Sequence, residues 1–312
     1  MCRWLKKYRN SSLLAIRTRL NCRTLNVKHM PTLAKLKLKF RAELIGQYPL
    51  REIDQFFAMS VEEVLGYSRV EIHVNSDEVI QGAKRDKFNT IIRGLRSNEP
   101  IQYLLGSTEF YGLKFKVNPH VLIPRPETEE LIRWIAEDCK ESNNSILDLG
   151  TGSGCIAISL KKEIPHAIVH GVDKSISALN LAKKNAELNK IGVEFFAFDI
   201  LNQESLGFMS FDLMVSNPPY VTLEDKKVMA KNVVDYEPHL ALFVSEGDPL
   251  IFYRRIVDLA EGHLVKGGKI FFEINESFAS EIRSLLTDRG FTSVEIRKDL
   301  NSRYRMAKGI KT

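Results

Sequence analysis

The chain has 312 residues, 44% of them hydrophobic, which suffices for two domains with sizeable cores, and no apolar run approaches the roughly 20 residues that a membrane-spanning helix requires. The net charge of +6 is concentrated at one end: residues 1–42 hold 12 Lys or Arg and no Asp or Glu, whereas the other 270 residues carry 33 basic and 39 acidic side chains. An acidic body argues against direct binding of nucleic acid, because a nucleic-acid surface needs clustered positive charge in the folded part.

Residues 1–32 are rich in arginine, free of acid and interspersed with serine and leucine. This pattern is typical of a mitochondrial targeting peptide, and we expect the protein to reach the mitochondrion with cleavage before about residue 35. The alternative interpretation is a basic arm that binds RNA.

Apolar residues recur at spacings of three and four between residues 33 and 104, which predicts a small helical domain. Ser60 and Glu63 have the spacing of a capping box, so one helix is expected to begin at Ser60. A later helix is expected to start at Asp86 and to end near Leu95.

Residues 105–126 are expected to form a hairpin and a linker. Phe110, Leu113 and Phe115 alternate with polar residues around Tyr111–Gly112, which predicts two short antiparallel strands. Three prolines then stiffen the connection to the next domain: Pro119, Pro124 and Pro126.

From residue 127 to the C-terminus, predicted strands alternate with helices, which is typical of an α/β fold with a mostly parallel sheet and helices on both faces. The expected strands are Ser145–Leu149, Ala167–Val172, Val193–Phe198, Phe211–Ser216, Lys269–Ile274 and Ser293–Arg297, with an antiparallel addition at Tyr304–Ile310. The expected helices are Thr128–Asp138, Ser175–Asn189, Leu250–Leu264 and Phe278–Arg289, with one more after the first strand.

A glycine-rich loop follows the first of these strands. Asp148 stands near the end of the strand, and the loop runs through Gly150, Thr151, Gly152, Ser153 and Gly154. Glycines let the backbone turn sharply and approach a ligand closely. The spacing is G-x-G-x-G rather than the G-x-G-x-x-G of dinucleotide sites, and the acid would repel a pyrophosphate. An acid and a tight loop favour a cofactor that carries an amine and a sulfonium, namely S-adenosylmethionine (SAM).

Two further acids follow the next two strands. Asp173 is expected beside the glycine loop, where it can accept hydrogen bonds from both ribose hydroxyls. Asp199 can accept from an adenine amino group, and Ile200 can wall the ring. Taken alone, Asp199 is equally well explained as a turn or helix-capping residue.

The fourth strand runs directly into Asn217, Pro218, Pro219 and Tyr220. An amide nitrogen is a poor nucleophile, so its two hydrogens must meet acceptors that raise the charge density on nitrogen. Asn217 Oδ1 and the Pro218 carbonyl are the candidate acceptors, and Tyr220 is the candidate wall for the flat target group. Such a site acts by placement and electrostatic stabilisation. The tetrapeptide alone is also compatible with a simple turn.

At this point the chain resembles a known family. ILDLGTGSG and VSNPPY resemble class I SAM-dependent methyltransferases that act on planar nitrogen. QYLLGSTEF, LIPRPETEELI, YEPHLAL, VKGGKIFFEI and RKDLNSRYR are similar to the PrmC/HemK family, the glutamine-N5 methyltransferases of peptide-chain release factors. The resemblance covers most of residues 33–310. The chain departs from the family pattern at Pro249 and Ser302, where the family tends to have glycine.

The resemblance implies a class I SAM-dependent methyltransferase domain over 127–312, a substrate-binding helical domain over 33–104 and a hairpin linker between them. It implies SAM at Gly150, Gly152, Gly154, Asp173 and Asp199. It also implies that residues 217–220 clasp the glutamine of the Gly-Gly-Gln loop of a release factor. With the leader, the expected substrate is a mitochondrial release factor, and the enzyme is expected to be a monomer.

Three alternatives stay open. They are an N6-adenine methyltransferase of DNA or RNA, a glutamine methyltransferase of a ribosomal protein, and a non-catalytic binding protein with this fold. Cys139 and Cys155 are far apart and form no CxxC pair, so no metal site is expected.

Overall fold

The computed structural model describes residues 31–139, 144–227, 229–244 and 247–312, so the leader expected over residues 1–32 lies almost wholly outside the described part. Contacts divide the chain into two units, one ending at Ile92 and the other running from Arg93 to Thr312. The domain boundary that the sequence suggests at residue 104 stays a prediction. No described helix is both long and apolar enough to span a membrane.

The first unit is helical. Its helices are α2 (Leu33–Leu44), α3 (Leu50–Leu65), α4 (Arg69–Val74) and most of α5 (Gly82–Arg96). Phe40 lies at its centre, with its ring edge-on to Phe57 and Phe88 at centroid distances of 5.4 and 6.3 Å. Edge-on aromatic pairs add a modest attraction to the burial of the rings themselves, so α2, α3 and α5 hold together around these three side chains.

The helix start expected at Ser60 is wrong. Ser60 lies inside α3, which begins ten residues earlier, directly after Pro49. The Ser60 hydroxyl is buried and donates to the Phe56 carbonyl at 2.7 Å, one turn back in the same helix. A serine in a helix interior satisfies its hydroxyl in this way, so the spacing to Glu63 carries no capping function here.

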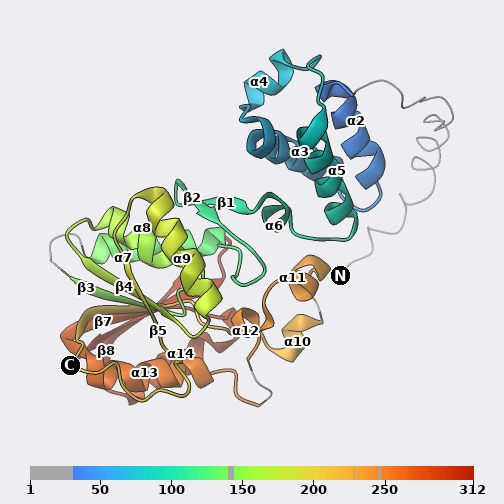
Figure 1. The fold of residues 1–312 in the computed structure, drawn as a ribbon. Coiled ribbons are helices and arrows are strands. Elements are labelled where there is room, and N and C mark those ends of the chain that lie inside the picture. The colour runs from blue at the N-terminus through green and yellow to red at the C-terminus, as the bar shows by residue number, and fades with distance from the viewer. Residues whose placement is uncertain (1–30, 140–143, 228, 245–246) are drawn as a thin grey trace. The chain divides into compact units, whose positions relative to one another are not determined.

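The second unit contains the hairpin and the α/β domain (Figure 1). The hairpin strands are β1 (Ser107–Phe110) and β2 (Leu113–Lys116), which pair antiparallel as expected. The strands of the large sheet are β3 (Ser145–Leu149), β4 (Ile168–Asp173), β5 (Glu194–Ala197), β6 (Phe211–Ser216), β7 (Leu264–Glu273), β8 (Phe291–Lys298) and β9 (Tyr304–Lys311). The helices are α6 (Ile101–Leu105), α7 (Pro126–Asp138), α8 (Cys155–Glu163), α9 (Ile176–Asn189), α10 (Leu223–Lys226), α11 (Lys231–Tyr236), α12 (His239–Leu242), α13 (Ile251–His263) and α14 (Ala279–Asp288), with a 3-10 turn at Glu276–Phe278.

The seven strands lie in the order β5-β4-β3-β6-β7-β9-β8. All the described pairs are parallel except those of β9, which runs antiparallel to both of its neighbours, β7 and β8. The order reverses between β3 and β6, so the carboxyl ends of these two strands meet at a switch point, where ligands bind in α/β sheets. The expected class I methyltransferase architecture is confirmed.

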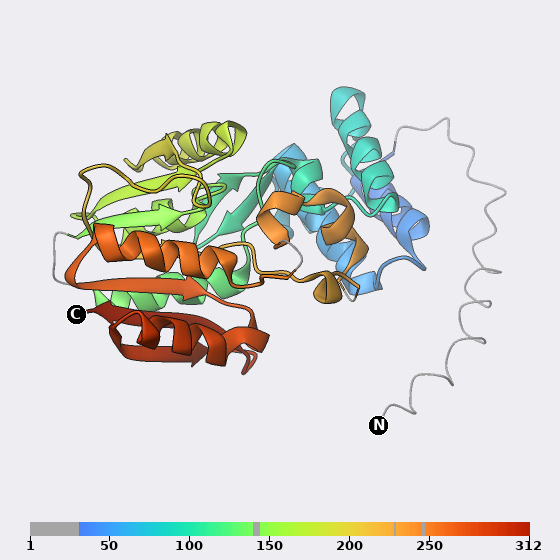
Figure 2. The ribbon, with the colours of Figure 1, turned by 90° about the horizontal axis from the view of Figure 1, so that it is seen from below.

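Both faces of the sheet are covered. Along β6, Leu213 and Val215 join the core beneath α7, α8 and α9, whereas Met214 joins the core beneath α13 and α14. Alternate residues of a strand point to opposite faces, so this division gives three layers. Figure 2 shows α13 and α14, in orange and red, lying over the strands on one of these faces.

Ser302, one of the two departures from the family, has a left-handed backbone with φ of 65° in the turn between β8 and β9. A residue with a Cβ is strained there, whereas glycine is not. Ser302→Gly should relieve this strain, although glycine also gains conformational entropy in the unfolded chain, which offsets part of the gain. We expect a net rise of about 0.5 kcal/mol in the free energy of unfolding, measured by urea denaturation. Ser284→Gly, in the exposed interior of α14, is the control and should lower it.

Candidate active site

The glycine-rich loop leaves β3 and enters α8 through three left-handed glycines: Gly150, Gly152 and Gly154, with φ of 75°, 54° and 81°. The amides of Gly150 and Thr151 both donate to the Val172 carbonyl of β4 at 2.8 Å, which fixes the loop against the neighbouring strand. A residue with a Cβ would be strained at these angles, so the three glycines are needed for the backbone conformation of the loop.

Asn185 of α9 anchors the same loop from the other side. Its buried Nδ2 donates to the Ser153 carbonyl at 2.9 Å and to the Lys116 carbonyl at 3.0 Å, and its Oδ1 accepts from the Lys116 amide at 2.7 Å. One amide side chain therefore joins the hairpin to the glycine loop. Asn185 is not recognisable from the sequence, because a single polar residue on a helix carries no sign of its partners.

Asp148 is fully buried beneath the loop. Its Oδ2 accepts from Thr151 Oγ1 at 2.6 Å and from the Ala157 amide at 3.2 Å, and its Oδ1 has no hydrogen-bond partner among the described residues. Burial raises the pKa of Asp148 to about 7, because a carboxylate loses its hydration there.

This pKa predicts how stability depends on pH. The folded-state pKa of Asp148 lies above its ordinary value near 4, so its contribution to stability is complete below about pH 4 and is lost as the pH rises to 7. Three pKa units correspond to about 4 kcal/mol. Asp148→Asn keeps the shape without the charge. Denaturation of both proteins at pH 5 and pH 8 should show the variant gaining stability over the native protein as the pH rises, and an equal difference at both values would contradict the prediction.

Asp173 ends β4 beside the loop. Its Oδ2 accepts from the Gly152 amide at 3.0 Å and its Oδ1 from the Ser175 amide at 2.8 Å, which holds the carboxylate in one orientation. Burial raises the pKa of Asp173 as well. A carboxylate accepts more hydrogen bonds than these two, so Asp173 can also accept from a hydroxyl of a ligand in the cavity that it lines.

Asp199 and Ile200 follow β5. Asp199 Oδ1 accepts from the Leu201 amide at 3.0 Å and Oδ2 from Asn202 Nδ2 at 2.8 Å, and the bond from Asn202 holds the pKa of Asp199 below its ordinary value. Asp199 therefore serves as a turn residue, as the simpler interpretation has it, and it also lines the cavity described below together with Ile200.

The loop after β6 carries residues 217–220, which are the predicted binding site for the target amide. Asn217 Nδ2 donates to Thr128 Oγ1 at 3.3 Å, and the hydroxyl of Tyr220 donates to Glu273 Oε1 at 3.1 Å. Asn217 Oδ1 and the Pro218 carbonyl oxygen accept no hydrogen bond from any residue that the structure describes. Both expected acceptors are thus available to a ligand.

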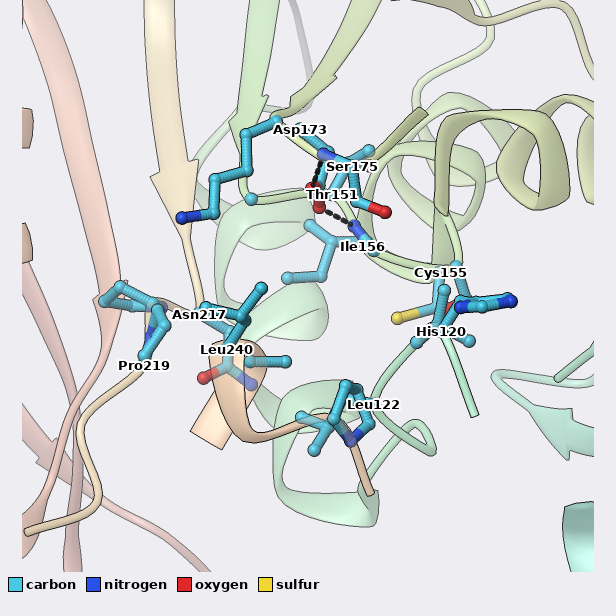
Figure 3. Close-up of a pocket in the computed structure, with 18 of the residues that line it drawn as sticks. His120, Leu122, Thr151, Cys155, Ile156, Asp173, Ser175, Asn217, Pro219 and Leu240 are labelled. Carbon is cyan, nitrogen blue, oxygen red and sulfur yellow. Dashed lines mark hydrogen bonds between the residues drawn. The ribbon is translucent and has the colours of Figure 1, made fainter. Parts of the chain in front are cut away.

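Two hollows meet at this loop. The first is a cavity of about 240 Å³ lined by the glycine loop, Asp173, Asp199 and Ile200. The second, of about 570 Å³, lies on the side of Tyr220. Asn217 and Pro218 line both. Figure 3 shows the first cavity, with Asp173 and Ser175 on one side and Asn217 and Pro219 across from them.

Ten of the thirteen predicted site residues line the first cavity: Gly150, Thr151, Gly152, Ser153, Asp173, Asp199, Ile200, Asn217, Pro218 and Pro219. Asp148 and Gly154 lie beneath it, and Tyr220 lines the second cavity only. The roles assigned to these residues stay predictions. The lining fits SAM, a cation that bears a nucleoside. Asp173 presents a carboxylate at the cavity wall, Gly150 and Gly152 leave the loop without a Cβ at two lining positions, and Asp148 Oδ1 lies unpartnered beneath the loop. The described residues form no cluster of three or more metal ligands.

Family models match two parts of the chain. Residues 127–240 match the Methyltransferase small domain, and residues 57–106 match the PrmC N-terminal domain.

Among curated proteins, the chain is 44% identical to the release factor glutamine methyltransferase of Flavobacterium psychrophilum, a match that covers 87% of this chain and 96% of that protein. It is 41% identical to the release factor glutamine methyltransferase of Bacteroides thetaiotaomicron, over 85% and 95% of the two chains. Among solved structures, the hMettl16 catalytic domain has a TM-score of 0.52 at 19% identity, covering 73% of this chain and 81% of that one, which is a likeness of fold.

Proposed function

Since the chain belongs to the release factor glutamine methyltransferase family and is a SAM-dependent methyltransferase, we propose that it methylates the side-chain amide nitrogen (N5) of the glutamine in the Gly-Gly-Gln motif of a peptide-chain release factor. The observation that carries this proposal is the position of Asn217 and Pro218, which line both cavities. A carboxamide entering from the second cavity meets their free oxygens at the boundary with the first.

The residues act by gripping and orienting the amide. Asn217 Oδ1 and the Pro218 carbonyl accept its two hydrogens, which directs the nitrogen lone pair toward the cofactor cavity and raises its charge density. SAM, when bound in the first cavity, would supply an electrophilic methyl group; its transfer would form a nitrogen–carbon bond, leave the electron pair of the broken carbon–sulfur bond on sulfur and release one proton from nitrogen to solvent. Asp173 would hold the ribose, and Tyr220 would pack against the flat face of the amide.

Intact mass measurement and peptide mapping of release factors incubated with the protein and SAM test this proposal. The expected result is a gain of one methyl group on the Gly-Gly-Gln glutamine. A release factor whose Gln is replaced by Glu is the control and should stay unmodified. With total RNA, DNA and ribosomal proteins present in the same reaction, methyl groups found only in nucleic acid or only in a ribosomal protein would reject the assignment.

We further propose that the natural substrate is a mitochondrial release factor. The support is the leader over residues 1–32, whose eight Lys or Arg and no Asp or Glu are typical of an imported protein. The curated relatives named above are bacterial. A fusion of residues 1–42 to a reporter should enter isolated mitochondria in the presence of a membrane potential, and a fusion with its arginines changed to glutamine should not. If neither fusion entered mitochondria, the mitochondrial assignment would be overturned, whereas the proposed methylation of a release factor would stand.

We propose that the enzyme acts as a monomer and without contact to nucleic acid. The net charge of −6 in the 270 residues after position 42 supports the second part. Light scattering after gel filtration should give the mass of one chain, and a dimer would contradict the first part.

A further inference from the structure

Glu273 is a buried carboxylate at the end of β7, 1% exposed, that the sequence analysis did not single out. Its Oε2 accepts from Thr128 Oγ1 at 2.6 Å, and its Oε1 accepts from the Tyr220 hydroxyl at 3.1 Å. Among the described residues it forms no salt bridge, since the nearby Arg305 pairs with Asp299. Burial raises the pKa of Glu273, whereas the hydrogen bonds from Thr128 and Tyr220 and the charge of Arg305 favour the ionised carboxylate.

The Thr128 bond determines which way the chain of hydrogen bonds runs. A hydroxyl has one proton, and at 2.6 Å from a carboxylate that proton goes to Glu273. The oxygen of Thr128 is therefore an acceptor toward Asn217, and it receives the Nδ2 group at 3.3 Å. Because Nδ2 is held by Thr128, Asn217 Oδ1 is the end of the amide that stays free for a ligand.

The hydrogen bond from Tyr220 to Glu273 likewise removes a donor from the site. The phenolic proton goes to Glu273 Oε1, so Tyr220 has no proton left to donate to a ligand and its ring is held as a wall. The carbonyl of Glu273 itself accepts from the Tyr253 hydroxyl at 3.1 Å, which fixes the strand end that carries the carboxylate. Glu273 thus holds both ends of the Asn217–Tyr220 segment.

We propose that Glu273 is a positioning residue that, through Thr128, orients Asn217 so that the site presents only hydrogen-bond acceptors to the target nitrogen. This inference deepens and rests on the proposed function. The site then selects a group with two N–H donors, because a carboxylate side chain in the same place would set oxygen against oxygen.

Glu273→Gln tests the direction of the chain while it preserves the shape. The new amide group can donate to Thr128 Oγ1, which frees the Thr128 proton to donate to Asn217 Oδ1. Asn217 then turns its NH2 toward the substrate NH2, and two donors oppose each other. We expect kcat to fall by about 10²-fold while the dissociation constant of SAM and the melting temperature stay close to those of the native enzyme.

A matched pair at Thr128 separates positioning from packing. Thr128→Ser keeps the hydroxyl and should keep most of kcat, whereas Thr128→Val keeps the volume, loses the hydroxyl and should lower kcat by at least about tenfold. Equal activity of the serine and valine variants would overturn the inference. So would full activity of a folded Glu273→Gln variant.

A second measurement needs no substrate. In protein labelled with 15N-asparagine, the side-chain signal of Asn217 is identified by its loss in Asn217→Ala, and its NH2 hydrogens should exchange with solvent more slowly in the native protein than in Glu273→Gln. Identical exchange would contradict the inference even if methyl transfer occurs. Absence of methyl transfer to a release factor by the native enzyme would instead overturn the proposed function, and the exchange measurement would still decide the role of Glu273.

Discussion

Asn217→Ala should lower kcat for methylation of the release factor by about 10²- to 10³-fold while SAM still binds. The variant removes the oxygen that accepts one hydrogen of the target amide and leaves the glycine loop and Asp173 untouched. The Pro218 carbonyl remains, so a residual rate is expected. Single-turnover kinetics at saturating SAM and release factor measure the loss, and calorimetry measures SAM binding.

Asn189→Ala provides a matched control. Asn189 is another amide of the same domain, whose Nδ2 donates to the carbonyls of Lys114 and Asn185, and it lines neither cavity. This variant should keep kcat and lose only a little stability. If Asn217→Ala retains more than about a tenth of the native kcat, the grip on the amide does not lie at this residue and the assignment of the second cavity to the substrate fails with it.

The prediction from sequence was most accurate where burial and local geometry agree. The predicted bounds of β3 and β6 match the structure to the residue, because each is a short, mostly apolar run with a strand-ending residue close behind it: Gly150 after β3 and Pro218 after Asn217. The glycine loop and residues 217–220 stand out in the sequence for a similar reason, since each is a run of consecutive residues. Their roles stay predictions.

Other features depend on partners far along the chain. Thr128 and Glu273 are hydrogen-bonded across 145 positions, and neither position alone shows that the other is near. No helix is expected from the sequence between β6 and α13, where the structure has α10, α11 and α12. These three helices have four to six residues each, too short for a periodic pattern to emerge.

Asp173→Asn should produce the opposite kinetic effect to Asn217→Ala: SAM affinity falls by at least about 10²-fold while kcat at saturating SAM changes little. Asp173 accepts a backbone amide on each carboxylate oxygen, from Gly152 and from Ser175. Asparagine has one oxygen and one NH2, so one of these backbone N–H groups would face another donor. The loop or the start of α9 must shift, and the ribose also loses a charged acceptor.

Asp212→Asn tests whether this loss is specific. Asp212 also accepts a backbone amide, that of Ser145 at 2.8 Å, but it stands at the start of β6, away from the carboxyl ends where the cavities lie. Its asparagine variant should bind SAM with native affinity. Because the proposed role of Asp173 is in cofactor binding and that of Asn217 is at the reacting nitrogen, the two site variants should affect separate kinetic constants. If Asp173→Asn lowered kcat and left SAM binding intact, the first cavity would not be the cofactor site.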